Sequence, residues 1–176
     1  GRLAEPAGDM TFDEAYDAFA EVVEAGADAD VILIETMSDM TELRAALLAA
    51  RERSDLPVIA TMTFAEDMRT FTGVSAECFA LVASPLADAI GVNCSLGPKE
   101  LLPVAEKLVT LTPKPVIVQP NAGLPDSRGN YPVGAEEFAE YAKKFLECGV
   151  RIIGGCCGTT PEHIALLADL AKRFKP

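Results

Sequence analysis

The sequence predicts an α/β fold in which short parallel strands alternate with helices. Five short runs rich in Val, Ile and Ala are each bounded by turn residues, as is typical of strands buried in a parallel sheet. These runs cover residues 31–34, 57–62, 89–92, 115–118 and 151–153. Segments with helical spacing of apolar residues flank them, at 12–25, 40–53, 75–82, 98–111, 135–148 and 161–174. Strict alternation of the two implies right-handed crossover connections.

Local signals mark where several of these helices begin. Thr160 suits the N-cap of the last helix, because its hydroxyl can accept a hydrogen bond from a free backbone N–H, and Pro161 suits the first helical position. The pairs Ser38-Asp39 and Gly97-Pro98 predict two further helix starts of the same kind.

Polar residues follow all five predicted strands at the same end. In chain order these ends read Glu35-Thr36, Thr61-Met62-Thr63, Asn93-Cys94, Gln119-Pro120-Asn121 and Cys156-Cys157. A (β/α)8 barrel, or TIM barrel, builds its active site from the ends of many strands. A doubly wound open sheet more often concentrates function at one switch point. The pattern therefore favours the barrel.

The number of strands predicts only part of a barrel. A complete (β/α)8 barrel takes about 250 residues, whereas this chain has 176 residues and five strand–helix units. We expect residues 1–176 to be the C-terminal part of one barrel domain, with strands four to eight and their helices. The missing N-terminal strands, or a partner, would complete it.

The charge and hydropathy of the chain exclude several classes of function. The net charge of −12 argues against a nucleic-acid partner, which would require clustered Lys and Arg. No apolar run approaches the roughly 20 residues that cross a bilayer, and no basic stretch followed by an apolar one opens the sequence. We therefore expect a cytoplasmic protein that binds neither nucleic acid nor membrane.

The five cysteines are placed unevenly along the chain. An odd number of cysteines without a secretion signal favours metal binding or thiol chemistry over disulfides. Cys78 and Cys148 fall inside helical segments, whereas Cys94, Cys156 and Cys157 follow apolar runs. These last three are the candidate catalytic and metal-binding residues.

The spacing of the three strand-end cysteines is compatible with a catalytic zinc site. Such a site uses three protein ligands and leaves a fourth position open. The 62 residues from Cys94 to Cys156 are too many for a zinc finger, but they fit two strand–helix units whose ends converge. Glycines on both sides of the cysteine pair would permit a sharp turn. Three other interpretations stay open at this point: small buried side chains, a vicinal disulfide between Cys156 and Cys157, and a thiol redox site.

His163 is the only histidine of the chain, and it lies a few residues beyond the cysteine pair. It could be a fourth ligand, or it could face the solvent from the first turn of the last helix. With a single histidine, Ser-His-Asp and Cys-His catalysis are nearly excluded unless the missing strands supply a partner.

Three segments together resemble the homocysteine S-methyltransferase family. They read GVNCSLGP at 91–98, PNAG at 120–123 and GGCCGTTPEH at 154–163. The resemblance extends over essentially the whole chain, including IETMSD at 34–39. Within the family it is closest to the homocysteine-binding barrel of cobalamin-dependent methionine synthase.

The resemblance implies a role for each strand end. The family binds zinc through the cysteines that match Cys94, Cys156 and Cys157, and homocysteine binds through its sulfur at the open zinc position. The acidic residue that holds the substrate's amino group falls on Glu35, whose other interpretation is a carboxylate that caps the next helix. Asn93 would help to fix the substrate or the neighbouring backbone. Asn121 and Thr63 lie on the same rim without an assigned role.

The expected function is therefore zinc-dependent transfer of a methyl group to homocysteine, which forms methionine. The methyl donor is expected to be methylcobalamin, with cobalamin bound elsewhere in the full-length protein and not by this chain. A betaine or S-methylmethionine is the alternative donor. A truncated barrel that binds zinc without turnover, and a thiol redox protein, are alternatives of a different class.

Overall fold

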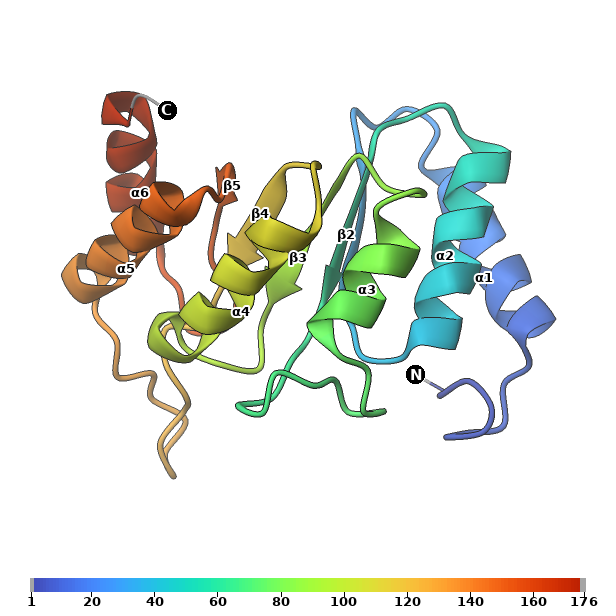
Figure 1. Cartoon of the computed structure of the whole chain (residues 1–176), viewed down its shortest axis with the longest axis horizontal. Coiled ribbons are helices and arrows are strands. Elements are labelled where there is room, and N and C mark those ends of the chain that lie inside the picture. Colours follow the sequence, from blue (N-terminus) through green and yellow to red (C-terminus); the bar gives the residue numbers. More distant parts are fainter. Residues whose placement is uncertain (1, 175–176) are drawn as a thin grey trace.

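The computed structural model describes residues 2–174 and contains one sheet of five parallel strands in chain order (Figure 1). The strands are β1 (Ile32–Met37), β2 (Val58–Met62), β3 (Ala89–Asn93), β4 (Val116–Gln119) and β5 (Ile152–Ile153). Each strand pairs only with its neighbours in the sequence. The predicted alternation of parallel strands and helices is confirmed.

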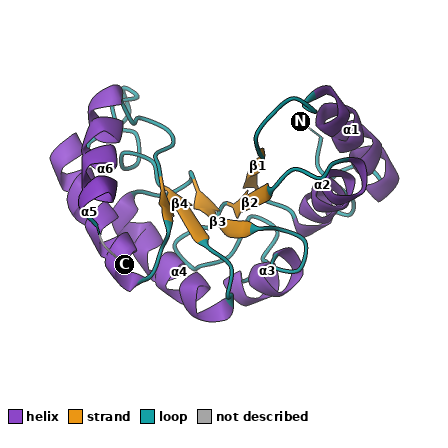
Figure 2. Ribbon diagram, turned by 90° about the horizontal axis from the view of Figure 1, so that it is seen from above, coloured by secondary structure: helices purple, strands orange, loops and turns teal. Residues whose placement is uncertain are grey.

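Residues 2–174 contain six helices, which cover one face of the sheet. They are α1 (Phe12–Ala25), α2 (Met40–Arg53), α3 (Ala76–Ala83), α4 (Pro98–Leu111), α5 (Ala135–Cys148) and α6 (Pro161–Arg173). Viewed from above, the strands form an arc with the helices on its convex side, and the concave side is open (Figure 2). Within residues 2–174, no helix is both long enough and apolar enough to cross a membrane.

The main hydrophobic core fills the layer between the sheet and its helices. Helices α2, α3 and α4 contribute large apolar side chains to this core, and the largest fully buried ones include Leu43, Leu47, Phe79, Leu101 and Leu108. Helix α2 is buried on a second side as well, because α1 packs against it. Its buried alanines allow this close approach; they are Ala45, Ala46, Ala49 and Ala50.

Strand β1 contains the one irregularity in the pairing of the sheet. Ile34 pairs with Ala60 and Met37 with Met62, so β1 has one more residue than β2 over this stretch. Thr36 takes up the extra length in a left-handed conformation with a φ of 62°. The prediction that this strand ends at residue 34 is therefore wrong: the bulge lets pairing continue to Met37, with Glu35 and Thr36 exposed.

Other element boundaries differ from the predicted ones by about one residue. Ser75 is the N-cap of α3 and not its first helical residue, because its hydroxyl accepts a hydrogen bond from the Cys78 N–H. Helix α6 ends at Arg173, one residue earlier than predicted. The N-caps at Asp39, Gly97 and Thr160 lie where the sequence predicts them.

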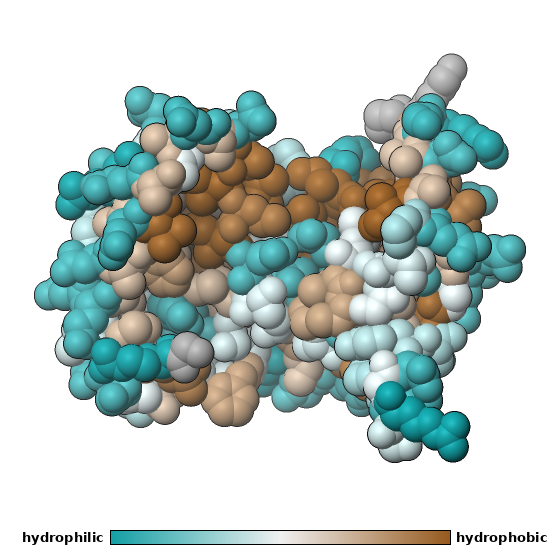
Figure 3. Space-filling view, turned by 180° about the vertical axis from the view of Figure 1, so that it is seen from behind, coloured by the Kyte–Doolittle hydropathy of each residue, from teal (hydrophilic) through white to brown (hydrophobic). Residues whose placement is uncertain are grey.

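The concave face and both edges of the sheet carry apolar side chains. Figure 3 shows such side chains gathered on this face. At the β1 edge, Val31 and Leu33 are each 41% exposed. At the β5 edge, an apolar pocket lies between the strand and α6, lined by Ile153, Gly154, Ile164, Leu167, Ala168 and Ala171. The two edges of the arc do not pair with each other within the described residues.

Asp39 is the N-cap of α2, and its replacement should destabilise the fold. Its buried carboxylate accepts hydrogen bonds from the N–H groups of Thr41 and Glu42 at 2.8 and 3.0 Å. Asp39→Ala leaves both groups without this partner and should lower the free energy of unfolding by about 1–2 kcal/mol. Urea denaturation measures the change. The exposed Asp55, replaced by Ala, is the control and should change stability by less than about 0.5 kcal/mol; equal effects of the two changes would contradict the capping role.

Candidate metal centre

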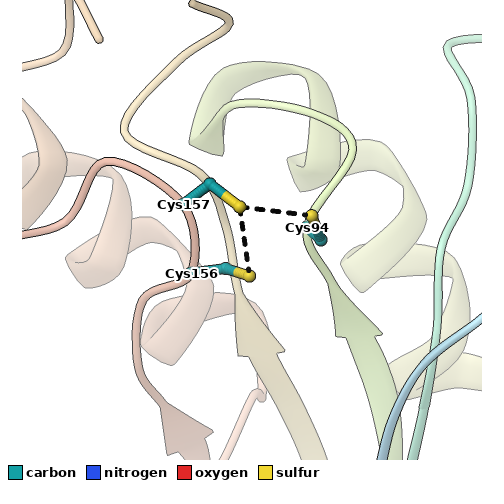
Figure 4. Close-up of side chains that lie close together, drawn as sticks. All are labelled: Cys94, Cys156 and Cys157. Atoms are coloured by element: carbon teal, nitrogen blue, oxygen red, sulfur yellow. Dashed lines mark hydrogen bonds between the residues drawn. The ribbon is translucent and has the colours of Figure 1, made fainter. Parts of the chain in front are cut away.

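The structure brings the three strand-end cysteines together at one end of the sheet. The sulfur of Cys157 lies 3.7 Å from that of Cys94 and 3.9 Å from that of Cys156 (Figure 4). All three sulfurs lie within 4.8 Å of one another. All five cysteines of the chain are free thiols in this structure. These separations allow three sulfurs to bind one ion, since zinc–sulfur bonds are about 2.3 Å long.

Cys94 points toward the pair because the chain turns sharply at the end of β3. Cys94 and Ser95 both have left-handed backbones, with φ angles of 59° and 55°. The Cys94 N–H still donates to the Gln119 carbonyl of β4 at 3.0 Å, so the turn starts from the sheet itself. The Ser95 hydroxyl donates to the Phe64 carbonyl at 2.7 Å and holds the far side of the turn. Residues other than glycine rarely adopt this conformation, and here hydrogen bonds maintain it.

Hydrogen bonds hold the cysteine pair to the segment that follows β4. The Cys156 N–H donates to the Pro120 carbonyl at 2.8 Å, and the Ala122 N–H donates to the Cys157 carbonyl at 2.8 Å. The buried Asn121 side chain accepts a third hydrogen bond, from the Cys157 N–H at 3.1 Å. Because the turn at Cys94 also pairs with β4, this strand positions all three sulfurs.

Gly158 and Tyr131 form one wall of the cluster. Gly158 follows the cysteine pair with a φ of 80°, and a side chain there would overlap the ring of Tyr131. Burial, followed by the charge of the Cys157 thiolate and a hydrogen bond with it, raises the pKa of the Tyr131 phenol. The sequence analysis did not identify Tyr131, whose only signal is an aromatic residue in the Pro- and Gly-rich segment after β4.

The electrostatics of the three sulfurs favour a bound cation. Burial and the negative charge of the Cys94 thiolate raise the pKa of the Cys156 thiol to about 12. Like charges at this separation oppose one another, so a positive charge among the sulfurs would stabilise their thiolate forms. Thiolates are soft ligands that suit zinc and related ions. The donor set therefore fits a thiophilic metal ion.

His163 is not oriented as a metal ligand. It is buried, and its Nδ1 accepts a hydrogen bond from the Thr160 N–H at 3.2 Å. Its Nε2 is then the protonated nitrogen and donates to the Val133 carbonyl at 3.0 Å. The Phe138 ring packs edge-on against it. Both the proposed ligation and the alternative of a solvent-facing side chain are thus wrong, and His163 fixes the end of the loop that carries Tyr131.

Glu35 and Asn93 lie at the same end of the sheet as the cluster, with different exposure. Glu35 is exposed in the bulge of β1, whereas Asn93 is fully buried. The Asn93 amide nitrogen lies 3.8 Å from the Cys156 sulfur. Glu35 does not cap α2, because Asp39 takes that position. Thr63, also on this rim, donates its N–H and its hydroxyl to the Met37 carbonyl and so extends the pairing of β1 with β2.

Comparison with known proteins finds a matching family and solved structures with a similar fold. A family model described as homocysteine S-methyltransferase matches residues 1–171. The fold is similar to the homocysteine methyltransferase MmuM from Escherichia coli in its apo form, with a TM-score of 0.74 and 23% identity. That similarity covers 96% of this chain and 60% of MmuM, and it confirms the predicted partial barrel. The metallated form of MmuM gives a TM-score of 0.71 and 27% identity over 88% of this chain and 52% of that one.

Replacement of Gly158 tests whether contact with Tyr131 shapes the cysteine turn. Gly158→Ala adds both left-handed strain and overlap with the ring, whereas Gly129→Ala, at a φ of 82°, adds the strain alone because nothing lies within 4 Å of its position. We expect Gly129→Ala to cost about 1–2 kcal/mol of unfolding free energy and Gly158→Ala about 1–3 kcal/mol more.

The double variant Gly158→Ala with Tyr131→Ala should recover part of that additional loss, because the overlapping ring is removed. Urea denaturation of the four proteins provides the comparison. Equal costs at Gly158 and Gly129 would show that the ring does not constrain the turn.

Proposed function

The chain belongs to the homocysteine S-methyltransferase family, and on this basis we propose that it forms the metal-binding part of a zinc-dependent homocysteine S-methyltransferase. One observation carries the proposal: three cysteine sulfurs lie within 4.8 Å of one another at the carboxyl ends of two strands. Cys94, Cys156 and Cys157 would hold the zinc and leave its fourth position open, as catalytic zinc sites do.

The proposed substrate is homocysteine, a small molecule with a thiol at one end and an α-amino acid at the other. When bound, the zinc would hold the substrate sulfur as a thiolate, a better nucleophile than the thiol. Glu35 is exposed near the end of β1, at the same end of the sheet as the cysteines, where its carboxylate would pair with the substrate ammonium. Asn93 would support both groups and not contact the substrate directly, because its side chain is buried.

Methyl transfer forms a carbon–sulfur bond to homocysteine and breaks the bond between the methyl group and its donor, while the thiol proton passes to solvent. We propose methylcobalamin as the donor, on the resemblance of 91–98 to the cobalamin-linked members, with cobalamin bound outside this chain.

The chain spans about 60% of MmuM, and this favours a second candidate function, in which the chain binds zinc without turnover. Assays of methionine formation with methylcobalamin, a betaine and S-methylmethionine distinguish these possibilities.

We expect the purified chain to bind one zinc ion through three sulfurs, at zinc–sulfur distances of about 2.3 Å. Cys94→Ser, Cys156→Ser and Cys157→Ser should each remove most of the zinc, because a hydroxyl is a poor replacement for a thiolate. Metal analysis and X-ray absorption measure content and ligands. Zinc affinity should fall as the pH falls, since protons compete for the same sulfurs.

Two cysteines outside the cluster provide matched controls for the metal experiment. Cys78 lies exposed on α3, and Cys148 ends α5 with its sulfur hydrogen-bonded to the Phe145 carbonyl. Cys78→Ser and Cys148→Ser should both retain a full equivalent of zinc. Loss of zinc in either variant, or a wild-type chain that binds none with its thiols reduced, would refute the assignment.

Glu35→Gln tests the substrate assignment separately from the metal. The change removes the charge but preserves the volume, so zinc content should stay the same while homocysteine binding weakens. A charge-assisted hydrogen bond contributes about 1.5–3 kcal/mol, which corresponds to a ten- to hundredfold change in affinity. Titration calorimetry of the zinc-loaded chain measures the dissociation constant.

Glu66→Gln is the control for Glu35→Gln, because Glu66 is exposed on the loop after β2 at the same end of the sheet. It removes the same charge and should leave homocysteine affinity unchanged to within about twofold. If Glu35→Gln instead removed the zinc, Glu35 would support the metal and would not bind the substrate.

A further inference from the structure

The side chain of Asn93 contacts three separate parts of the site. Its carbonyl oxygen accepts hydrogen bonds from the Thr36 N–H at 2.9 Å and the Thr61 hydroxyl at 2.7 Å. Its amide nitrogen donates to the Thr36 hydroxyl at 2.7 Å and lies 3.8 Å from the Cys156 sulfur. An asparagine side chain has two N–H donors and two acceptor lone pairs. All four are used here, and none remains for a ligand.

Two of these contacts hold the bulge of β1. Thr36 has a left-handed backbone, which is unfavourable for a β-branched residue unless its surroundings maintain it. Asn93 pairs with both polar groups of Thr36, the backbone N–H and the hydroxyl. Glu35 directly precedes Thr36, so the same two hydrogen bonds determine how Glu35 is presented on the concave side.

The fourth contact reaches the cysteine cluster. The second N–H of the Asn93 amide is directed to the Cys156 sulfur, at a distance within reach of an N–H···S hydrogen bond. A thiolate is a stronger acceptor than a thiol, so this bond strengthens when a metal converts the sulfur to its charged form. Groups that hydrogen-bond to metal ligands orient them and change metal affinity by about ten- to a hundredfold when they are replaced.

We propose that Asn93 is a positioning residue that fixes Glu35 relative to the Cys156 sulfur through one rigid amide. The inference rests on the proposed function, which assigns the substrate ammonium to Glu35 and a metal-ligand role to Cys156. The ammonium and the sulfur of homocysteine are joined by a short flexible chain, so both ends can bind at once only if the two protein groups are held within its reach. Asn93 is buried between β1 and the cluster and makes that link.

Spectroscopy of the cobalt-substituted chain tests the sulfur end of the link. Asn93→Ala removes the N–H donor, so the sulfur-to-cobalt charge-transfer band should shift and the dissociation constant for Co²⁺ should rise about tenfold or more. Asn93→Asp keeps the acceptor oxygen for Thr36 and Thr61 but loses the donors, and it should shift the band even if Asn93→Ala folds poorly. Thr61→Val is the matched control: it removes one hydrogen bond to Asn93 and leaves the N–H donors, so it should keep the wild-type band.

A double-mutant cycle on homocysteine affinity tests the link itself. Glu35→Gln should weaken binding about ten- to a hundredfold in the wild-type background and only about two- to threefold in the Asn93→Ala background, because Glu35 is no longer held in place. Additive effects of the two substitutions would overturn the coupling.

The outcomes separate this inference from the function on which it rests. A wild-type chain that binds neither zinc nor cobalt would overturn both. If the wild-type chain binds metal and homocysteine while the Asn93 variants match Thr61→Val in their spectra, only the positioning role of Asn93 is overturned. Shifted spectra together with a non-additive cycle would support it.

Discussion

The three cysteine sulfurs lie within 4.8 Å of one another, and burial together with the neighbouring Cys94 thiolate raises the pKa of Cys156 to about 12. Holding such a cluster together requires a rigid support, and the backbone provides it. The Cys94 turn and the cysteine pair both hydrogen-bond to β4 or to the residues that follow it. Tyr131 and Gly158 close one side, and His163 anchors the loop that carries Tyr131. The geometry of the cluster thus depends on hydrogen bonds from groups that are not themselves metal ligands.

The parts of the fold that could be predicted from the sequence are those specified by neighbouring residues. Buried strands of Val and Ile, Thr160-Pro161 at a helix start and polar residues at strand ends are local patterns, and the structure has all of them. The bulge at Thr36 could not be predicted, because its left-handed backbone depends on Asn93, which lies 57 residues away in the sequence. The burial of His163 was missed for the same reason, since the Val133 carbonyl is 30 residues away.

The candidate site, too, could be predicted from the sequence only in part. The convergence of Cys94 with the cysteine pair follows from two strand ends at the same end of a parallel sheet, and it could be predicted from the spacing and the resemblance together. The sequence could not predict that Asn93 uses all four of its hydrogen-bonding positions, because an asparagine at a strand end is equally compatible with a side chain that contacts the substrate. Only its burial and its partners in space distinguish a supporting residue from a binding one.

The chain-order sheet also determines how the site assembles. Every strand pairs with its sequence neighbours, so each pairing of the sheet encloses one intervening helix. The ligand set is less local: Cys94 follows β3 and the cysteine pair follows β5, and β4 lies between them. The three sulfurs meet only after all three strands have paired. The free energy of metal binding therefore acts on these strands as one cooperative unit, and their local opening becomes rarer when the metal is bound.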